Sequence, residues 1–280
     1  MTPLMTITVH LDPVVEVGPF ELTWHGMMTA AGLLVGALVA ARFARRVGLD
    51  PARVSTLVIV AAAAGIAGAR LFFLALNDPA ALAAPAAWLG THGFAIYGAL
   101  LAALMGVGVY LRRASLPVRY LDALAYGFPF GLAVGRIGDV VNGEHFGPPT
   151  SQPWGIRWTH PDVLAPSAEV AYHSGGLYEV VLALVIVAVV VPAARRLTMP
   201  TDLLWLVLAL YGAGRLLMFF WRDDSEAAVL GLHTAQLVSV GFVGLALAGA
   251  SARRRGGLRL SLGAAVGRRP PGSGMRRTHR

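Results

Sequence analysis

Residues 54–76 read VSTLVIVAAAAGIAGARLFFLAL, and Arg70 is the single charged side chain among them. A helix of roughly 20 residues is needed to cross the hydrocarbon core of a bilayer, and this stretch is long enough. Lipid offers the backbone no hydrogen-bond partner, so a spanning segment must satisfy its own N–H and C=O groups as a helix. The stretch therefore predicts a transmembrane helix.

Similar apolar stretches recur along the chain, at about 20–41, 93–111, 119–137, 174–194, 202–220 and 232–251. Hydrophobic residues make up 56% of the 280 residues and charged residues only 14%. A soluble domain normally carries roughly one quarter charged residues, so this composition points to lipid as the solvent. We therefore predict an all-α, polytopic membrane protein with about seven transmembrane helices.

The distribution of arginine indicates which side of the predicted membrane each connection faces. They cluster in four connections, which are Arg42 to Arg53, Arg112 to Arg119, Arg195 to Arg196, and Arg253 to Arg255. By the positive-inside rule these four regions are cytoplasmic, which predicts an N-out, C-in chain. We expect a single transmembrane domain over 1–251, with an outward-facing loop at about 138–173. Residues 252–280 are expected to form a basic, disordered cytoplasmic tail.

The net charge of +8 comes largely from these basic clusters and the tail, so it favours a topology signal over nucleic-acid binding. There is no cysteine, which excludes disulfides and a thiol nucleophile within the chain. The histidines are scattered, and we expect no metal site. No Lys or Arg precedes the first apolar stretch, so no basic signal-peptide region is expected and the amino terminus is predicted to be retained.

Several polar side chains fall inside the predicted spans and converge on their outer ends. The predicted directions place Arg70, Arg136 and Arg215 late in their spans, and His25, Tyr97, Tyr178 and Glu179 early in theirs. Singly, each could reach the interface or belong to an aromatic belt. Together, several charges at similar depth need partners or a bound ligand. Because arginine suits phosphate, the cluster favours a phospholipid headgroup.

The densest polar segment is residues 135–147, GRIGDVVNGEHFG. It resembles the signature of prolipoprotein diacylglyceryl transferases, Gly-Arg-x-Gly-Asn-x-x-Asn-x-Glu-x-x-Gly, and differs from it at one fixed position, Asp139. Other segments are similar to the family in the same order and extend the resemblance over about residues 20–250. They are Gly68 to Leu71, Ile96 to Gly98, His173 with Leu177 to Glu179, Tyr211 to Arg215 with Arg222, and Gly231 to Ser239.

The resemblance implies transfer of a diacylglyceryl group from phosphatidylglycerol to the lipobox cysteine of a preprolipoprotein signal peptide, in a bacterial plasma membrane and without a cofactor. It implies catalytic roles for Arg136, Arg215, Tyr97, Asp139 and Glu144. It implies substrate binding by Arg70, His25, Asn142, Gly147, Tyr178, Glu179, Tyr211 and Arg222. Arg136 and Arg215 would stabilise the leaving phosphate. Tyr97, Glu144 and His25 are the candidates for the base that deprotonates the thiol.

The chain departs from the family pattern in sensitive places. Asp139 stands where the family has Asn, and Tyr97 stands where many members have His. His25 stands where a Tyr is usual, Ala99 where the family has a second Gly, and Phe219 where the family has a Glu. An ionised Asp139 would place a negative charge beside Arg136, and we hypothesise that the missing acid at Phe219 compensates for it. Two other functions stay open, a non-catalytic phosphatidylglycerol-binding paralogue and a small-solute transporter.

Overall fold

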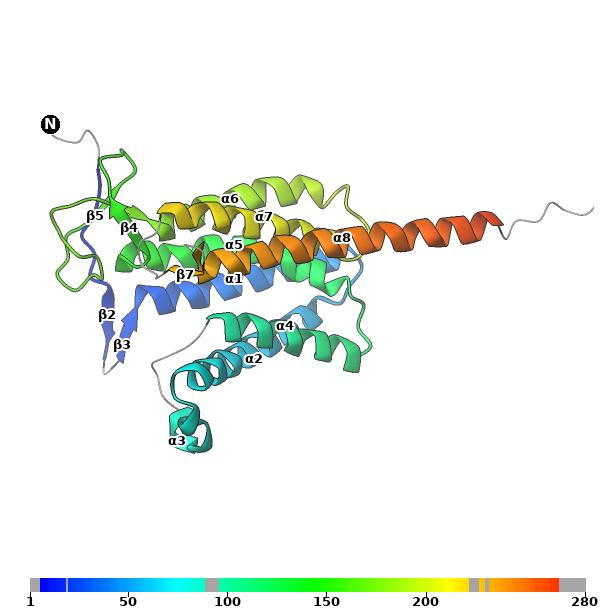
Figure 1. Cartoon of the computed structure of the whole chain (residues 1–280), viewed down its shortest axis with the longest axis horizontal. Coiled ribbons are helices and arrows are strands. Elements are labelled where there is room, and N and C mark those ends of the chain that lie inside the picture. Colours follow the sequence, from blue (N-terminus) through cyan, green and yellow to red (C-terminus); the bar gives the residue numbers. More distant parts are fainter. Residues whose placement is uncertain (1–5, 19, 89–95, 222–226, 230–231, 267–280) are drawn as a thin grey trace, which may run out of the picture.

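The computed structural model describes residues 6–18, 20–88, 96–221, 227–229 and 232–266, and seven long helices dominate this part of the chain (Figure 1). These helices are α1 (Trp24–Arg46), α2 (Pro51–Asn77), α4 (Ile96–Arg113), α5 (Tyr120–Asn142), α6 (Gly175–Ala193), α7 (Asp202–Met218) and α8 (Thr234–Val266). Short helices η1 (Pro79–Ala83) and α3 (Pro85–Trp88) follow α2, and η2 (Phe219–Trp221) follows α7.

Within the described residues, five helical segments are long and apolar enough to cross a membrane. They are α1, α2, α6, the segment Asp202–Trp221 and the segment Ala235–Ala252 of α8. The protein is therefore a mostly helical, multi-pass membrane protein, as predicted. The number of seven spans and their orientation stay predictions.

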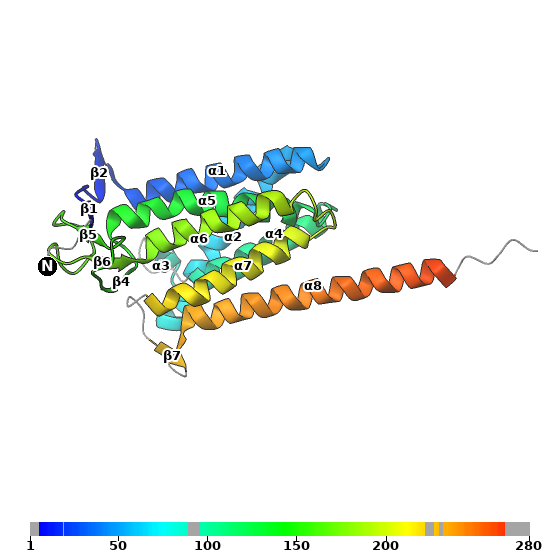
Figure 2. The ribbon, with the colours of Figure 1, turned by 90° about the horizontal axis from the view of Figure 1, so that it is seen from above.

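Helix α5 lies at the centre of the bundle and packs against α1, α6 and α7. Seen from above, α1, α5, α6, α7 and α8 lie in a row, while α2 and α4 form a separate pair on one side of it (Figures 1 and 2). Glycines let α1 and α5 approach closely, because a Cβ on Gly127 would lie 2.2 Å from the carbonyl oxygen of Gly36. Small residues at such contacts let membrane helices approach closely, so that van der Waals packing stabilises their association where no hydrophobic driving force acts.

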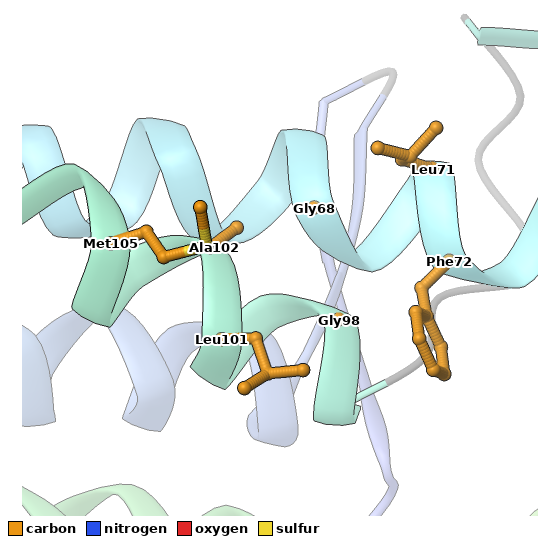
Figure 3. A pocket seen from close by; sticks show the side chains of 7 residues that line it. All are labelled: Gly68, Leu71, Phe72, Gly98, Leu101, Ala102 and Met105. Atoms are coloured by element: carbon orange, nitrogen blue, oxygen red, sulfur yellow. The ribbon is translucent and has the colours of Figure 1, made fainter.

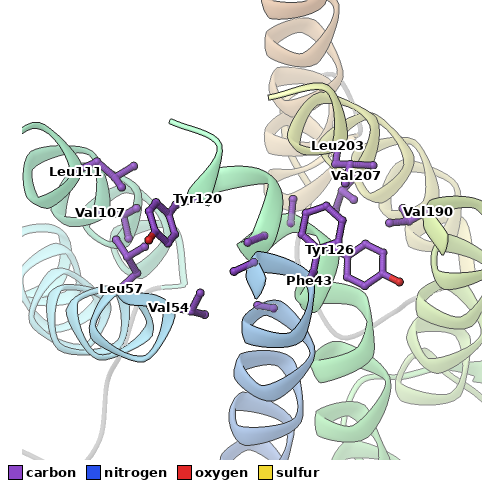
Figure 4. Close-up of a cluster of buried hydrophobic side chains, with 14 of the residues drawn as sticks. Phe43, Val54, Leu57, Val107, Leu111, Tyr120, Tyr126, Val190, Leu203 and Val207 are labelled. Carbon is purple, nitrogen blue, oxygen red and sulfur yellow. The ribbon is translucent and has the colours of Figure 1, made fainter. Parts of the chain in front are cut away.

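A cluster of buried side chains joins the two groups of helices at the end where α5 begins (Figure 4). Phe43 of α1 stacks on Tyr126 of α5 with ring centroids 4.5 Å apart. Asp122, buried beside this cluster, accepts hydrogen bonds from the backbone N–H groups of Thr201, Leu203 and Leu204. This carboxylate therefore caps the start of α7 and has a structural role, which leaves the polar chemistry to the other end of the bundle.

The opposite end carries short strands, which the all-α prediction missed. They are β1 (Ile7–Val9), β2 (Val14–Val17), β3 (Phe20–Thr23), β4 (Phe146–Pro149), β5 (Ile156–Trp158), β6 (Tyr172–Ser174), β7 (Ala227–Val229) and β8 (Leu232–His233). The main sheet has the order β1-β5-β6-β4, and the other strands form hairpins. Fully buried Trp158 donates to the carbonyl of Val140 and so fixes this sheet on the end of α5.

Several predicted boundaries were wrong. The first helix begins at Trp24, because Thr23 caps it by accepting from the N–H of Gly26, and residues 20–23 belong to β3. Helix α5 continues to Asn142, so the first residues assigned to the loop at 138–173 are helical, and most of that loop carries the sheet. Helix α8 continues to Val266, past residue 251 where irregular chain was expected to begin.

Candidate active site

The candidate site lies where α5 ends, next to the starts of α1 and α6 and the end of α7. Arg136 and Asp139 are three residues apart on α5, so their side chains share one face of the helix. Gly143 ends α5 in the left-handed conformation with φ 69°, as a glycine after a helix commonly does. The chain then turns back, and the N–H of Glu144 donates to the carbonyl of Asp139 at 3.0 Å. This turn brings Glu144 beside Asp139.

Glu179 of α6 bridges the two arginines. Its Oε2 lies 2.7 Å from Arg136 Nε, and its Oε1 accepts from Arg215 Nη1 at 2.5 Å. The Glu179 side chain is 1% exposed and the two arginine side chains are 21% and 18% exposed. Arg215 Nη1 also donates to the hydroxyl of Tyr211 at 3.4 Å, and its guanidinium lies 5.0 Å from the ring centre of Phe219. One buried acid thus holds two guanidinium groups at one place.

Asp139 connects the arginines to a second group of side chains. Its Oδ2 accepts from Arg136 Nη1, and its Oδ1 lies 2.7 Å from His25 Nδ1 of α1. The same His25 nitrogen lies 3.2 Å from Glu144 Oε2, and Asn142 Nδ2 donates to Glu144 Oε1 at 2.9 Å. The site is therefore one continuous network of alternating charges.

Glu144 lies outside the helices and stays ionised at neutral pH. Burial raises the pKa of its carboxyl, but the hydrogen bonds from His25 and Asn142 outweigh burial, so the pKa lies below its ordinary value of 4.5. A carboxylate in this state accepts hydrogen bonds and donates none.

The glycines of segment 135–147 explain why these groups come so close. A Cβ on Gly138 would lie 2.6 Å from the carbonyl oxygen of Trp24 and 2.7 Å from the Cα of His25. A Cβ on Gly176 of α6 would lie 3.0 Å from the Cβ of Asp139. A Cβ on Gly147 would lie 2.0 Å from the carbonyl oxygen of Trp221. Helices α1 and α6 can therefore touch α5 at Asp139 because no side chain intervenes.

The structure brings together most of the residues that the sequence singled out. The network contains Arg136, Asp139, Asn142, Glu144, His25, Glu179, Tyr211 and Arg215. Gly147 packs beside it against Trp221. One member of the network was not among the predicted site residues: His145, whose Nε2 lies 3.8 Å from Asp139 Oδ2. The position of His145 within segment 135–147 could have indicated that it belongs to the site.

Other predicted residues have different surroundings. Arg70 is buried on α2, donates to the carbonyl of Ala87 in α3 and lies over the ring of Phe73. The hydroxyl of Tyr178 contacts His173 Nδ1 and accepts from Trp154 Nε1. The side chain of Tyr97 and the whole of Arg222 lie outside the described residues. Roles for these four residues in substrate binding or catalysis stay predictions.

A pocket of about 170 Å³ opens between α2 and α4 (Figure 3). Its lining is apolar and consists of Gly68, Leu71, Phe72, Gly98, Leu101, Ala102 and Met105. It contains no ionisable group and therefore no candidate for acid, base or phosphate chemistry.

His25, Asp139 and Glu144 also form a possible metal site, because their ligand atoms lie within 4.8 Å of one another. Imidazole and carboxylate ligands would suit a divalent transition metal. The expectation of a metal-free site accordingly stays a prediction.

Comparison with known proteins identifies the family. The model for prolipoprotein diacylglyceryl transferase matches residues 13–251. The chain belongs to the prolipoprotein diacylglyceryl transferase family. Similar proteins named phosphatidylglycerol–prolipoprotein diacylglyceryl transferase include one from Chloroflexus aggregans, which is 33% identical over 79% of this chain and 82% of its own length. Those from Symbiobacterium thermophilum and Geobacter sulfurreducens are 31% and 32% identical, covering 84% and 89% of this chain and 90% and 98% of their own lengths.

Proposed function

We propose that this protein transfers the diacylglyceryl group of phosphatidylglycerol to the lipobox cysteine of preprolipoproteins. The names of its relatives support this activity. The observation that carries it is the pair Arg136 and Arg215, held together by Glu179 where α5, α6 and α7 meet. Phosphate recognition by arginine explains why two guanidinium groups are placed in one site of a membrane protein.

The chemistry follows from what these groups offer. The substrate thiol gives its proton to a base, for which Glu144 and His25 are the candidates within the network. Its sulfur forms a bond to the lipid glycerol carbon, and the C–O bond to phosphate breaks. Glycerol phosphate leaves with the electron pair, so negative charge grows on the phosphate. Each guanidinium has five N–H donors, more than Glu179, Asp139 and Tyr211 use in this network. The remaining donors would stabilise the leaving group electrostatically.

Asn142 offers a further substrate contact. Its side chain is buried, and its Oδ1 has no hydrogen-bond partner among the described residues. A buried acceptor without a partner is costly, and a hydroxyl of the glycerol headgroup would satisfy it. This contact would favour phosphatidylglycerol over a headgroup that lacks hydroxyls.

The proposed activity requires a defined membrane orientation. We place the chain in the bacterial plasma membrane with seven spans, the amino terminus outside and residues 252–280 in the cytoplasm. Three of the arginine clusters lie at or just after the ends of α1, α4 and α6, and these helix ends lie at the end of the bundle opposite the end of α5. The network then opens to the outer side, together with the strands that lie between α5 and α6, where an exported signal peptide would arrive.

A phosphatidylglycerol-binding paralogue without activity is the second candidate, because Asp139 places an added carboxylate against Arg136. One assay separates the two. Purified protein is incubated with phosphatidylglycerol vesicles and a lipobox peptide, and the peptide is analysed by mass spectrometry. The transferase adds one diacylglyceryl group at the cysteine.

Arg136→Ala should abolish this product, while Arg113→Ala should preserve it. Arg113 is a matched control, since it is an exposed arginine at the other end of the bundle. Binding of phosphatidylglycerol by the wild-type protein without any modified peptide would leave the paralogue as the correct function.

A further inference from the structure

The four-stranded sheet at the end of α5 has two unlike edges. Its order, β1-β5-β6-β4, leaves β1 and β4 without a further partner strand in the part of the chain that the structure describes. Two of the four residues of β4 are prolines, Pro148 and Pro149, which have no N–H group to offer to another strand. Strand β1 contains no proline. The edge that can still accept a strand is therefore β1.

The backbone of Thr8 faces this open edge. The N–H of Ile7 donates to the carbonyl of Gly155 at 3.1 Å, and the carbonyl of Val9 accepts from the N–H of Thr159 at 3.0 Å. Both neighbours of Thr8 thus direct their backbone groups towards β5. Because successive strand residues direct these groups to opposite sides, the N–H and C=O of Thr8 point away from the sheet. They are free to pair with an extended peptide.

Arg157 places a positive charge beside this edge. The parallel register pairs Arg157 of β5 with Thr8, so the two side chains lie on the same face of the sheet. Arg157 Nη2 donates to Thr8 Oγ1 at 3.3 Å, and the guanidinium therefore extends towards the edge. Its Nε is buried and has no hydrogen-bond partner among the described residues. A cation with an unsatisfied buried donor favours an anionic ligand.

We propose that β1 docks an extended segment of the polypeptide substrate and that Arg157 binds an acidic side chain of this segment. The segment is the part of the preprolipoprotein that follows the lipobox cysteine, so this inference rests on the proposed transferase function. It adds to the sheet as a fifth strand through the N–H and C=O of Thr8. Neighbouring strands lie about 4.8 Å apart, and the residue opposite Thr8 points to the face that carries Arg157. An acid at that position reaches the guanidinium.

The location of the sheet supports a peptide as the partner. Trp158 follows Arg157, is fully buried and donates to the carbonyl of Val140, which fixes β5 beside Asp139 at the end of α5. Figure 2 shows β1 and β5 together at this end of the bundle. A peptide whose cysteine lies at the arginine network thus has the sheet beside it. A lipid headgroup has no peptide backbone to pair with Thr8.

Peptide kinetics test the docking. One lipobox peptide ends at the cysteine, and the other continues for ten residues that carry a single Glu, moved along the segment one position at a time. With the Glu opposite Thr8, the KM of the wild type should be about fivefold lower for the long peptide than for the truncated one. Moving the Glu by one residue should remove this gain, because adjacent side chains point to opposite faces. N-methylation of the peptide amide that pairs with Thr8 should also remove it.

Exchanging charges tests the role of Arg157. Arg157→Gln should bring the two KM values to within about twofold of each other, and Arg157→Glu should prefer a long peptide with Lys in place of Glu. Arg113→Gln is the matched control, since Arg113 is an exposed arginine at the other end of the bundle. It should keep the wild-type preference. Thermal melting of each variant establishes that it is folded.

Three results would overturn the inference. One is a wild type with equal KM values for the two peptides at every position of the Glu. Another is a preference for the Glu peptide that persists in Arg157→Gln and is not reversed in Arg157→Glu. The third is a rise in the KM for phosphatidylglycerol instead of the peptide, which would assign Arg157 to the lipid headgroup. Failure of the proposed function looks different, since a folded wild type would then modify neither peptide.

Discussion

Replacing Glu179 by glutamine should destabilise the protein more than any exposed acid would. The carboxylate lies within 2.7 Å of Arg136 and 2.5 Å of Arg215, and the side chain is almost fully buried. Glutamine keeps the shape but removes the charge, and its NH2 group would face one of the two guanidinium groups. The substitution therefore leaves at least one buried arginine without an anionic partner.

The size of the effect follows from this burial. Removing one partner of a buried ion pair costs roughly 3–5 kcal/mol, and the arginine side chains are only about one-fifth exposed, so solvent screens them weakly. For a chain of this size, each kcal/mol corresponds to roughly 2–4 °C in Tm. We therefore expect Glu179→Gln to lower Tm by on the order of 10 °C.

Thermal unfolding in detergent measures this directly, with Glu169→Gln as the matched control because Glu169 is exposed in the loop before α6. The control should unfold at the wild-type temperature. Transferase activity of Glu179→Gln, measured well below its Tm, should also fall because the arginines are no longer fixed. A Tm within about 2 °C of wild type would refute the claim that Glu179 compensates two buried charges.

Three further outcomes test the surrounding structure. Gly138→Ala should reduce activity about tenfold or more by pushing α1 and His25 away from α5, whereas Gly241→Ala, whose Cβ would meet nothing within 4 Å, should not. Asp122→Ala should lower the unfolding free energy by about 1–2 kcal/mol, measured by denaturation, since it removes the cap of α7. Glu144 has a lowered pKa, so its stabilising contribution is complete above about pH 4.5 and is lost as acid protonates it. Melting temperatures recorded from pH 7 to pH 3 should fall more steeply for wild type than for Glu144→Gln.

The helices were predictable because each depends on local composition. Residues 54–76 predicted α2 to within a few residues, since a long apolar run in lipid has no alternative to a helix. The ends were less predictable, because they depend on single contacts. Thr23 starts α1, and Gly143 lets α5 continue to Asn142 before the chain turns. The short strands were missed, since pairing between β1 and β5 joins residues about 150 positions apart.

The signature segment alone contained Arg136, Asp139, Asn142 and Glu144, and its spacing was enough to indicate the family and to nominate the phosphate-binding arginine. Sequence could also nominate Glu179 and Arg215 one at a time. It could not show that Glu179 bridges the arginines or that His25 pairs with Asp139. Those contacts depend on how closely α1, α6 and α7 pack on α5, and glycines such as Gly138 between α1 and α5 and Gly176 between α5 and α6 allow the close approach. Local composition thus determined the membrane helices and the kind of chemistry, while tertiary packing decided which charges neutralise one another.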